Sequence, residues 1–331
     1  METDPRPLLT VDNLTIDIGG ANVVDGISFA VAPGKVMALV GESGCGKSLT
    51  SYAMLGLLPP AARRSGGSIR LDGRDLTALS EREFRKARGS EISIIFQEPS
   101  ASLDPLTTVG AQIAAAYRTH HPVSRAEAYA KARQMLADVG IPDPDRRLHQ
   151  YPFELSGGMC QRIMISIALI CSPRVLVADE PTTALDVTIQ AQILDLMKKL
   201  VADRDTAIVI ITHDMGVVAD IADDVAVMYA GRIAEIAPVH ALFAKPQHPY
   251  TALLLASVPK LSDAPKADLA TIEGRVPTPN EFGAGCRFAD RCPLATERCL
   301  AEQPPLFECG GGHRSACWHI DRMAEIRGKA A

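Results

Sequence analysis

Three short segments, taken in their order along the chain, most restrict what this sequence can fold into. The first is the glycine-rich segment at residues 41–48, Gly-Glu-Ser-Gly-Cys-Gly-Lys-Ser. The second is Leu-Ser-Gly-Gly-Met-Cys-Gln at residues 155–161, and the third is an apolar run at 175–178 that leads into Asp179-Glu180. Glycines before a helix and carboxylates after a strand are typical of phosphate-binding α/β proteins. The order therefore predicts an α/β fold that binds a nucleotide.

The first segment fits the pattern of a phosphate-binding loop. It follows the apolar run Val36–Val40, which is typical of a buried strand, and a helix is expected from Lys47 to about Leu58, where Pro59-Pro60 would stop it. We expect Lys47 to reach the β- and γ-phosphates of ATP and the Ser48 hydroxyl to bind Mg²⁺. The predicted ATP contacts in this loop are Gly41, Glu42, Ser43, Gly44, Cys45, Gly46, Lys47 and Ser48.

The two carboxylates of the third segment have different expected roles. Asp179 ends an apolar strand, so its carboxylate is expected beside the phosphate loop, where it would hold Mg²⁺ directly or through water. Glu180 is the candidate general base that polarises the water attacking the γ-phosphate. The alternative interpretation is an acidic strand end that enters an ordinary turn.

The second segment predicts another anion site. Ser156, Gly157 and Gly158 precede a helix expected to begin near Met159, and free N–H groups at the positive end of a helix dipole attract an anion. The phosphate loop already serves the chain's own nucleotide. The second site is therefore expected to contact ATP bound to another subunit.

Apolar runs and helical patterns alternate through the rest of the chain. An antiparallel opening pair is expected at 8–16 and 27–31, and further strands at 91–97, 174–179, 206–212 and 225–229, with a helix at 187–202. Ser80 with Glu83, and Ser124 with Glu127, form capping-box signatures. We predict a P-loop cassette in residues 1–257, with an inserted α-helical subdomain at about 104–155, and a linker and small cysteine-rich tail in 258–331.

The order of these segments resembles the ATP-binding subunits of ABC transporters over nearly the whole chain. Several strings resemble the dipeptide/oligopeptide (and nickel) importer subfamily. They are Gly41–Gly44, Phe96–Pro99, Asp179–Asp186, Tyr229–Arg232 and His248–Thr251, with Gly285–Phe288 and Arg291–Pro293 in the tail. The resemblance implies two ATP molecules sandwiched between paired cassettes, with a heterodimer favoured over a homodimer. It also implies two transmembrane permeases, an extracytoplasmic peptide-binding protein, and a place at the cytoplasmic face of the inner membrane.

The resemblance assigns further residues around the nucleotide. Gln97, at the end of an expected strand, matches the family's Q-loop glutamine, which touches Mg²⁺ and the attacking water. His213 matches the switch histidine that contacts the γ-phosphate, and Pro181–Asp186 matches the D-loop, which disfavours an ordinary turn after Glu180.

This sequence departs from the family's pattern at the position that contacts adenine. An aromatic ring is usual near Ile18, and this position is aliphatic, so base stacking is expected to be weak and Val24 to add only apolar contact.

Five of the eight cysteines lie after residue 285, and a reducing cytosol favours metal or cofactor binding over disulfides. Four of them fit the subfamily's tail motif: Cys286, Cys292, Cys299 and Cys317, with five, six and seventeen residues between them. The motif implies that these four cysteines bind one [4Fe–4S] cluster. Cys309 lies where the motif requires no cysteine. Zinc is the main alternative, although closely spaced cysteine pairs typical of zinc are absent from the sequence, and free thiols are the second.

Composition restricts the function classes. Hydrophobic residues make up 47% of the sequence and the net charge is −5, so a globular protein without a nucleic-acid-binding footprint is expected. No apolar run approaches the roughly 20 residues of a spanning helix, so we expect a soluble, cytosolic chain whose membrane role depends on partners.

This sequence lacks the features that are usual for four rival classes of protein. A DNA-maintenance ATPase of this superfamily carries a long coiled-coil insertion, a translation ATPase two cassettes, and an exporter a fused membrane domain. An iron–sulfur redox enzyme would be supported by a flavin or dinucleotide fingerprint. Peptides are the expected cargo, with nickel and glutathione as alternatives that the sequence does not separate.

Overall fold

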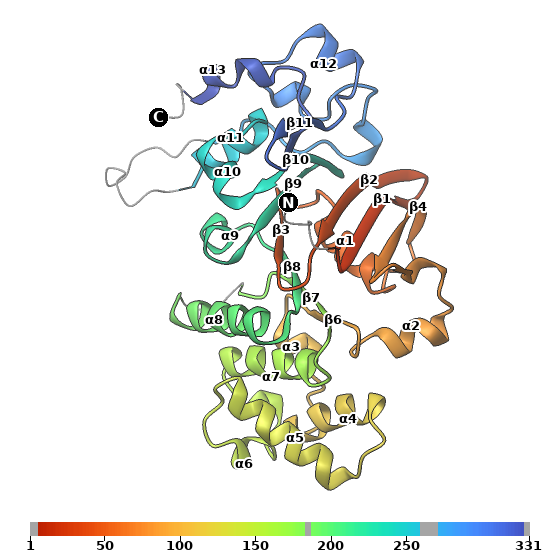
Figure 1. Ribbon diagram of the computed structural model, residues 1–331, viewed down its shortest axis with the longest axis vertical. Coiled ribbons are helices and arrows are strands. Elements are labelled where there is room, and N and C mark those ends of the chain that lie inside the picture. Colours follow the sequence, from red (N-terminus) through yellow and green to blue (C-terminus); the bar gives the residue numbers. More distant parts are fainter. Residues whose placement is uncertain (1–5, 183–186, 259–270, 328–331) are drawn as a thin grey trace. The chain divides into compact units, whose positions relative to one another are not determined.

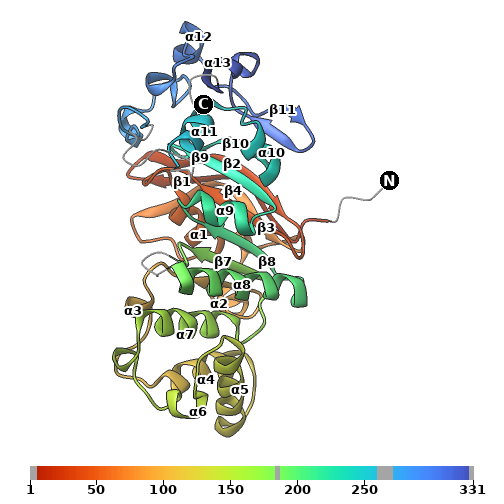
Figure 2. The same ribbon diagram turned by 90° about the vertical axis from the view of Figure 1, so that its left-hand side faces the viewer.

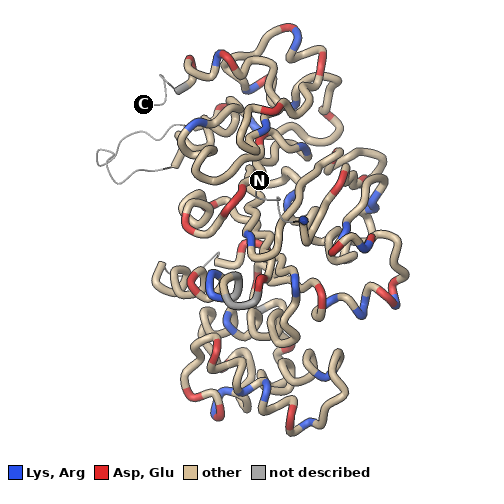
Figure 3. Tube along the Cα trace, viewed as in Figure 1, with Lys and Arg blue, Asp and Glu red and all other residues tan. Residues whose placement is uncertain are grey.

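The computed structural model describes residues 6–182, 187–258 and 271–327, which form two compact units (Figure 1). Unit 1 comprises Met1–Leu9, Val31–Val36 and Arg70–Ile211, and unit 2 comprises Thr10–Ala30, Met37–Ile69 and Thr212–Ala331, each within the described ranges. Lys and Arg residues are interspersed with Asp and Glu along the described chain (Figure 3). Within the same ranges, no helix is both long and apolar enough to span a bilayer.

Unit 2 is built on a mixed sheet that combines the strand before the phosphate loop with strands from the C-terminal tail. Its order is β11 (Phe307–Gly310), β12 (His313–Ser315), β10 (Arg232–Pro238), β9 (Asp224–Tyr229) and β3 (Val36–Val40). Strands β3 and β9 are parallel and the other pairs are antiparallel. The strand expected near 225–229 is therefore not the last one, because β10 and two tail strands extend the sheet.

A second sheet of unit 2 places β2 (Ala21–Val31), β1 (Leu9–Ile18) and β4 (Ala62–Leu71) side by side. The expected opening pair is thus present as a hairpin turning at Gly19-Gly20. Helix α1 (Lys47–Met54) ends earlier than predicted. Gly56 has a left-handed φ of 62°, and the Leu57 N–H donates to the Tyr52 carbonyl at 2.8 Å, so a glycine cap ends the helix before the prolines are reached.

Unit 1 contains three parallel, almost fully buried strands: β6 (Ile92–Ile95), β7 (Val175–Asp179) and β8 (Ala207–Ile211). Between β6 and β7 the chain forms α3 (Pro99–Ser102), α4 (Val109–His120), α5 (Arg125–Asp138), α6 (Pro144–Arg147) and α7 (Gly157–Leu169). Figure 2 shows α4, α5 and α6 gathered next to α7. Helix α2 (Glu81–Ala87) and α5 both begin with the predicted capping boxes.

The remaining elements complete the two units. Unit 1 also holds β5 (Arg74–Asp75) and α8 (Val187–Arg204). Unit 2 also holds α9 (Met215–Ile221), α10 (Val239–Ala244), α11 (Pro249–Ala256), α12 (Glu297–Ala301) and α13 (Ala324–Arg327). Ala252 of α11 packs with Leu294, Met323 and Ile326 in a small tail core. Residues 259–270 of the expected linker lie outside the described residues.

A fully buried carboxylate fastens the tail to the rest of unit 2. Glu235 of β10 accepts hydrogen bonds from the backbone N–H groups of Gln247 at 2.6 Å and His248 at 3.0 Å. Its Oε1 also lies 2.6 Å from Nε2 of His313 on β12. One side chain therefore satisfies polar groups from the segment before α11 and from the tail hairpin.

We predict that Glu235→Gln destabilises the attachment of the tail by about 1–3 kcal/mol, because the amide offers one acceptor where the carboxylate offers two. Trp318, the only tryptophan in the sequence, lies in the tail and reports its unfolding by fluorescence during urea titration. Glu308→Gln is the matched control, since that side chain on β11 is 70% exposed. Equal urea midpoints for the two variants would show that the buried carboxylate does not hold the tail.

Candidate nucleotide-binding site

The phosphate loop joins the buried strand β3 to α1 within unit 2. Gly41 has a φ of 144°, and a Cβ at this position would lie 2.1 Å from the Met228 carbonyl oxygen. Gly46 has a φ of 98°, and its Cβ would lie 2.8 Å from Val24 Cγ2. Side chains are therefore excluded at both ends of the loop. Gly46 precedes α1 and provides no side-chain cap, and the N-terminus of a helix attracts an anion.

The Lys47 side chain folds back onto the backbone of the phosphate loop. The residue is 8% exposed, and Nζ donates to the carbonyl oxygens of Gly41 at 2.7 Å and Glu42 at 3.0 Å. Burial raises the pKa of the neighbouring Cys45 thiol, which makes it a packing residue rather than a nucleophile. Val24 is fully buried against Gly46, and Ile18 is half-buried at the end of β1.

Unit 1 brings together Gln97 and Glu180. Asp179, 2% exposed, ends β7, and Glu180 follows with a left-handed φ of 48°. The Glu180 N–H donates to the Ile211 carbonyl at 2.8 Å, and Gln97 Nε2 donates to Glu180 Oε2 at 2.9 Å. Strained backbone of this kind costs about 1–3 kcal/mol and is found where the surroundings fix a functional group. Strand β6 ends at Ile95, so exposed Gln97 lies just beyond it rather than within it.

The Leu-Ser-Gly-Gly segment begins α7. The Ser156 hydroxyl accepts from the Met159 N–H at 3.4 Å, so the helix starts at Gly157, earlier than expected. Ser156 and Gly157 are exposed. Buried Gln161 donates through Nε2 to the Pro181 carbonyl at 2.6 Å, which ties α7 to the chain just after Glu180. Residues 183–186 of the expected D-loop lie outside the described residues.

The predicted site residues are thus divided between the two units. Unit 2 holds the phosphate loop, Ile18, Val24 and His213, which is exposed just before α9. Unit 1 holds Gln97, Asp179 and Glu180 together with Ser156, Gly157 and Gly158. The contacts described above join residues of the same unit.

The tail places the four predicted cysteine ligands around one pocket. Cys286, Cys292, Cys299 and Cys317 line it, and the Cys286 N–H donates to the Cys299 carbonyl at 2.7 Å. Burial raises the pKa of Cys292 to about 11 and that of Cys317 to about 12. Cys309, on β11, does not line this pocket. Across the described ranges, no group of three or more His, Cys, Asp or Glu side chains is arranged to hold a metal ion.

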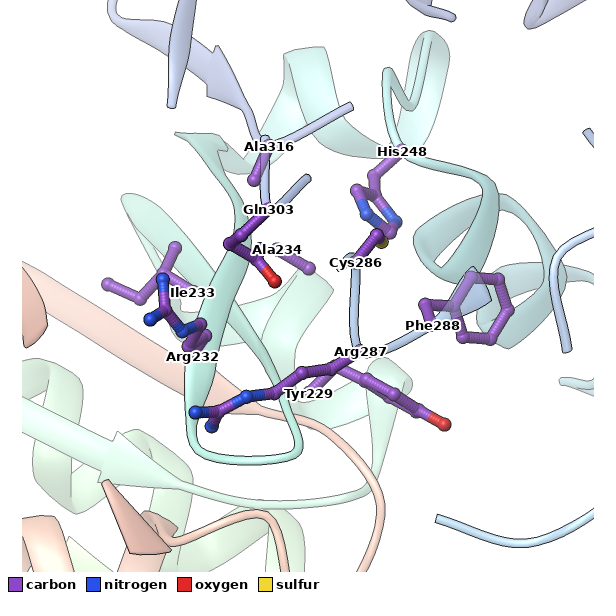
Figure 4. Close-up of a pocket in the computed structure, with 10 residues that line it drawn as sticks. All are labelled: Tyr229, Arg232, Ile233, Ala234, His248, Cys286, Arg287, Phe288, Gln303 and Ala316. Carbon is purple, nitrogen blue, oxygen red and sulfur yellow. The ribbon is translucent and has the colours of Figure 1, made fainter. Parts of the chain in front are cut away.

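An adjoining pocket shares Cys286 and His248 with the first (Figure 4). Burial lowers the pKa of His248 to about 4, so its ring is neutral, and Nδ1 accepts from the Tyr250 N–H at 3.1 Å. Figure 4 shows Arg287 extending from the same loop as Cys286. Arg287 donates to the Ala230 carbonyl.

Family models match two parts of the chain. Residues 24–183 match the model described as "ABC transporter", and residues 234–299 match "Oligopeptide/dipeptide transporter, C-terminal region". The first match contains the phosphate loop, Gln97, the Leu-Ser-Gly-Gly segment and Glu180. The second contains three of the four pocket cysteines.

Individual proteins agree with these matches. A probable peptide ABC transporter ATP-binding protein of Sinorhizobium fredii is 49% identical over 98% of this chain and 99% of its own length. A dipeptide transport ATP-binding protein of Bacillus subtilis is 48% identical over 96% of each chain. A solved cassette from Clostridium perfringens, part of an ABC transporter complex, superposes with a TM-score of 0.63 at 26% identity, covering 72% of this chain and 91% of its own.

A dimeric cassette solved with ADP and phosphate superposes equally well, with a TM-score of 0.63 at 24% identity over 70% of this chain and 98% of its own. The α/β cassette fold expected from the sequence is therefore confirmed. The chain belongs to the ABC transporter family, among the ATP-hydrolysing subunits of dipeptide and oligopeptide importers.

Proposed function

We propose that this chain hydrolyses ATP to drive the uptake of dipeptides and oligopeptides through two permease subunits, from the cytoplasmic face of the cell membrane. The observation that carries the ATPase role is the hydrogen bond just after β7, where Gln97 Nε2 donates to the Glu180 carboxylate at 2.9 Å. The peptide cargo is supported by relatives named for peptide and dipeptide transport, which match over nearly the full chain.

The residues of each unit would act on a different part of the reaction. The phosphate loop and Lys47 bind the phosphates, His213 contacts the γ-phosphate, and Ile18 and Val24 offer apolar contact to adenine. Glu180 accepts a proton from the attacking water, which Gln97 helps to orient. Ser48, Gln97 and Asp179 would hold Mg²⁺, which would supply positive charge to neutralise the phosphates.

A second cassette would complete the site. Ser156 and Gly157 are exposed at the start of α7, as a contact to another subunit's ATP requires. We infer a heterodimer of two related cassettes, working with an extracytoplasmic binding protein that delivers the peptide.

The helical subdomain, residues 104–155, would contact the permeases. Among its described residues are three large exposed apolar or aromatic side chains, Leu106 at 85%, Phe153 at 74% and Tyr151 at 37% exposed. Their segments adjoin, because the Val109 N–H donates to the Gln150 carbonyl at 2.9 Å. Exposed apolar groups of this kind are typical of protein–protein contact.

We further propose that the cysteine-rich tail, residues 258–331, binds a [4Fe–4S] cluster with a structural or regulatory role. The support is that four cysteines, the number that ligates such a cluster, line one pocket while Cys309 does not. Because three of these thiols have raised pKa values, loading would release protons.

Glu180→Gln is expected to retain ATP binding and lower hydrolysis by about 10²–10⁴-fold, because the amide cannot accept the proton of water. Lys47→Ala should instead weaken ATP binding. Equilibrium binding and phosphate release measured on each variant separate the two effects, with exposed Glu81→Gln as the carboxylate control. Near-parental hydrolysis by Glu180→Gln would remove Glu180 as the base.

The purified chain alone is expected to be largely monomeric with low ATPase activity per molecule, because the exposed Ser156 and Gly157 serve another subunit's nucleotide. Mass photometry and phosphate release should show activity rising when the second cassette is added. Full activity in a sample that stays monomeric at the assay concentration would rule out the shared site.

Anaerobic purification is expected to yield about four iron atoms per chain. Cys317→Ser should lower the iron content, and Cys309→Ser should leave it unchanged, as measured by elemental analysis and visible absorbance. Stoichiometric zinc, or protein without metal, would contradict the cluster.

Transport itself is tested with the permeases and binding protein in proteoliposomes. Uptake of a labelled dipeptide should depend on ATP and be lost with Glu180→Gln, and uptake of nickel alone would contradict the peptide assignment.

A further inference from the structure

The tail loop between Cys286 and Cys292 reaches the phosphate loop directly. Arg291, whose side chain is 6% exposed, places Nη1 at 2.9 and 3.1 Å from the two carboxylate oxygens of Glu42. The same nitrogen lies 3.2 Å from the Tyr229 hydroxyl. Nε and Nη2 donate to the carbonyls of Glu273 at 2.8 Å and Ile272 at 3.0 Å. One guanidinium therefore joins the phosphate loop, β9 and the end of the linker.

Glu42 is the second residue of the phosphate loop and is held at three points. Its carboxylate pairs with Arg291, its N–H donates to the Tyr250 hydroxyl at 2.9 Å, and its carbonyl accepts from Lys47 Nζ at 3.0 Å. The backbone contact to Lys47 means that a shift of Glu42 changes the position of the ammonium that binds phosphate. Arg291 and Lys47 are thus linked through one residue.

A second arginine of the tail loop, Arg287, contacts residues that pack against the phosphate loop. Arg287 pairs with Asp25 and donates to the Ala230 carbonyl. Asp25 follows Val24, which packs against Gly46, and its N–H donates to the Gly231 carbonyl at 2.8 Å. The Gly231 N–H in turn donates to the Cys45 carbonyl at 3.1 Å. The tail loop therefore supports both ends of the phosphate loop.

These contacts differ from an ordinary surface ion pair. Exposed pairs contribute little because water screens them and both side chains lose freedom. The Arg291 side chain is 6% exposed and the Glu42 side chain is 30% exposed, so the pair is partly shielded from water, and a charge-assisted hydrogen bond in such a setting is stronger and fixes geometry. The phosphate loop also tolerates little displacement, since Gly41 already lies against the Met228 carbonyl.

We propose that Arg291 is a positioning residue for nucleotide binding, which fixes Glu42 and thereby the phosphate loop, so that the cysteine-bearing tail and the ATP site are energetically coupled. Coupling of this kind is reciprocal: the tail strengthens nucleotide binding, and nucleotide binding protects the tail. The inference rests on the ATP binding proposed above, and none of its contacts passes through a cysteine side chain, so it does not depend on a metal.

The first test measures the dissociation constant of a fluorescent ATP analogue for the full-length chain. Arg291→Ala and Glu42→Gln should each weaken binding by about tenfold, and the double variant should be no weaker than the worse single one, because both remove the same contact. Arg291→Lys should restore part of the affinity. Arg275→Ala is the control, since its pair with Glu281 is exposed and the affinity should stay at the parental value.

The second test measures hydrogen exchange in residues 286–292. ADP should slow exchange there in the parent and in Arg275→Ala, and should not do so in Arg291→Ala. Glu42→Gln keeps the tail arginine intact, so it tests the coupling even if Arg291→Ala loosens the tail.

Parental affinity in both Arg291→Ala and Glu42→Gln, or fully additive effects in the double variant, would overturn the proposal. A parent chain that binds no ATP would overturn the proposed function as well. If the parent chain binds ATP but the variants keep the parental affinity or act additively, only the positioning role is overturned.

Discussion

The close approach of the phosphate loop to strand β9 is the constraint on which the nucleotide site depends. At Gly41 the backbone lies against the Met228 carbonyl, so that a Cβ would meet it at 2.1 Å, and at Gly46 the side chain of Val24 fills the space. Two buried residues of unit 2, Met228 and Val24, thus fix the position of the loop. Its N–H groups can then face a phosphate without the reorganisation that a flexible loop would require.

The hydrolytic residues depend on a different local constraint. Glu180 adopts a left-handed φ of 48°, and the Ile211 carbonyl and Gln97 hold its N–H and carboxylate. The two contacts offset the cost of the strained backbone and orient the side chain. Binding groups and hydrolytic groups are therefore stabilised independently, by the loop packing of unit 2 and by the strand ends of unit 1.

Much of this arrangement could be predicted because it is encoded locally. The apolar run before Gly41, the capping box at Ser124 and the strand before Asp179 each lie within a few residues of the element they determine. The left-handed glycine at Gly56 was a missed local signal for the end of α1. By contrast, the contact of Arg291 with Glu42 joins residues 249 positions apart, and no periodicity reveals it. Both residues lay in strings that carried the resemblance, but their pairing required the fold.

Several contacts that fasten the tail do not involve its cysteine side chains. Glu235 anchors the tail hairpin through His313, Arg291 and Arg287 anchor the loop that carries Cys286, and Met323 packs on α11. These contacts are ionic, hydrogen-bonded and apolar. A zinc finger, in contrast, folds only when its metal binds. In a tail fastened in this way, a cluster bound at the pocket would add to an existing fold rather than create it.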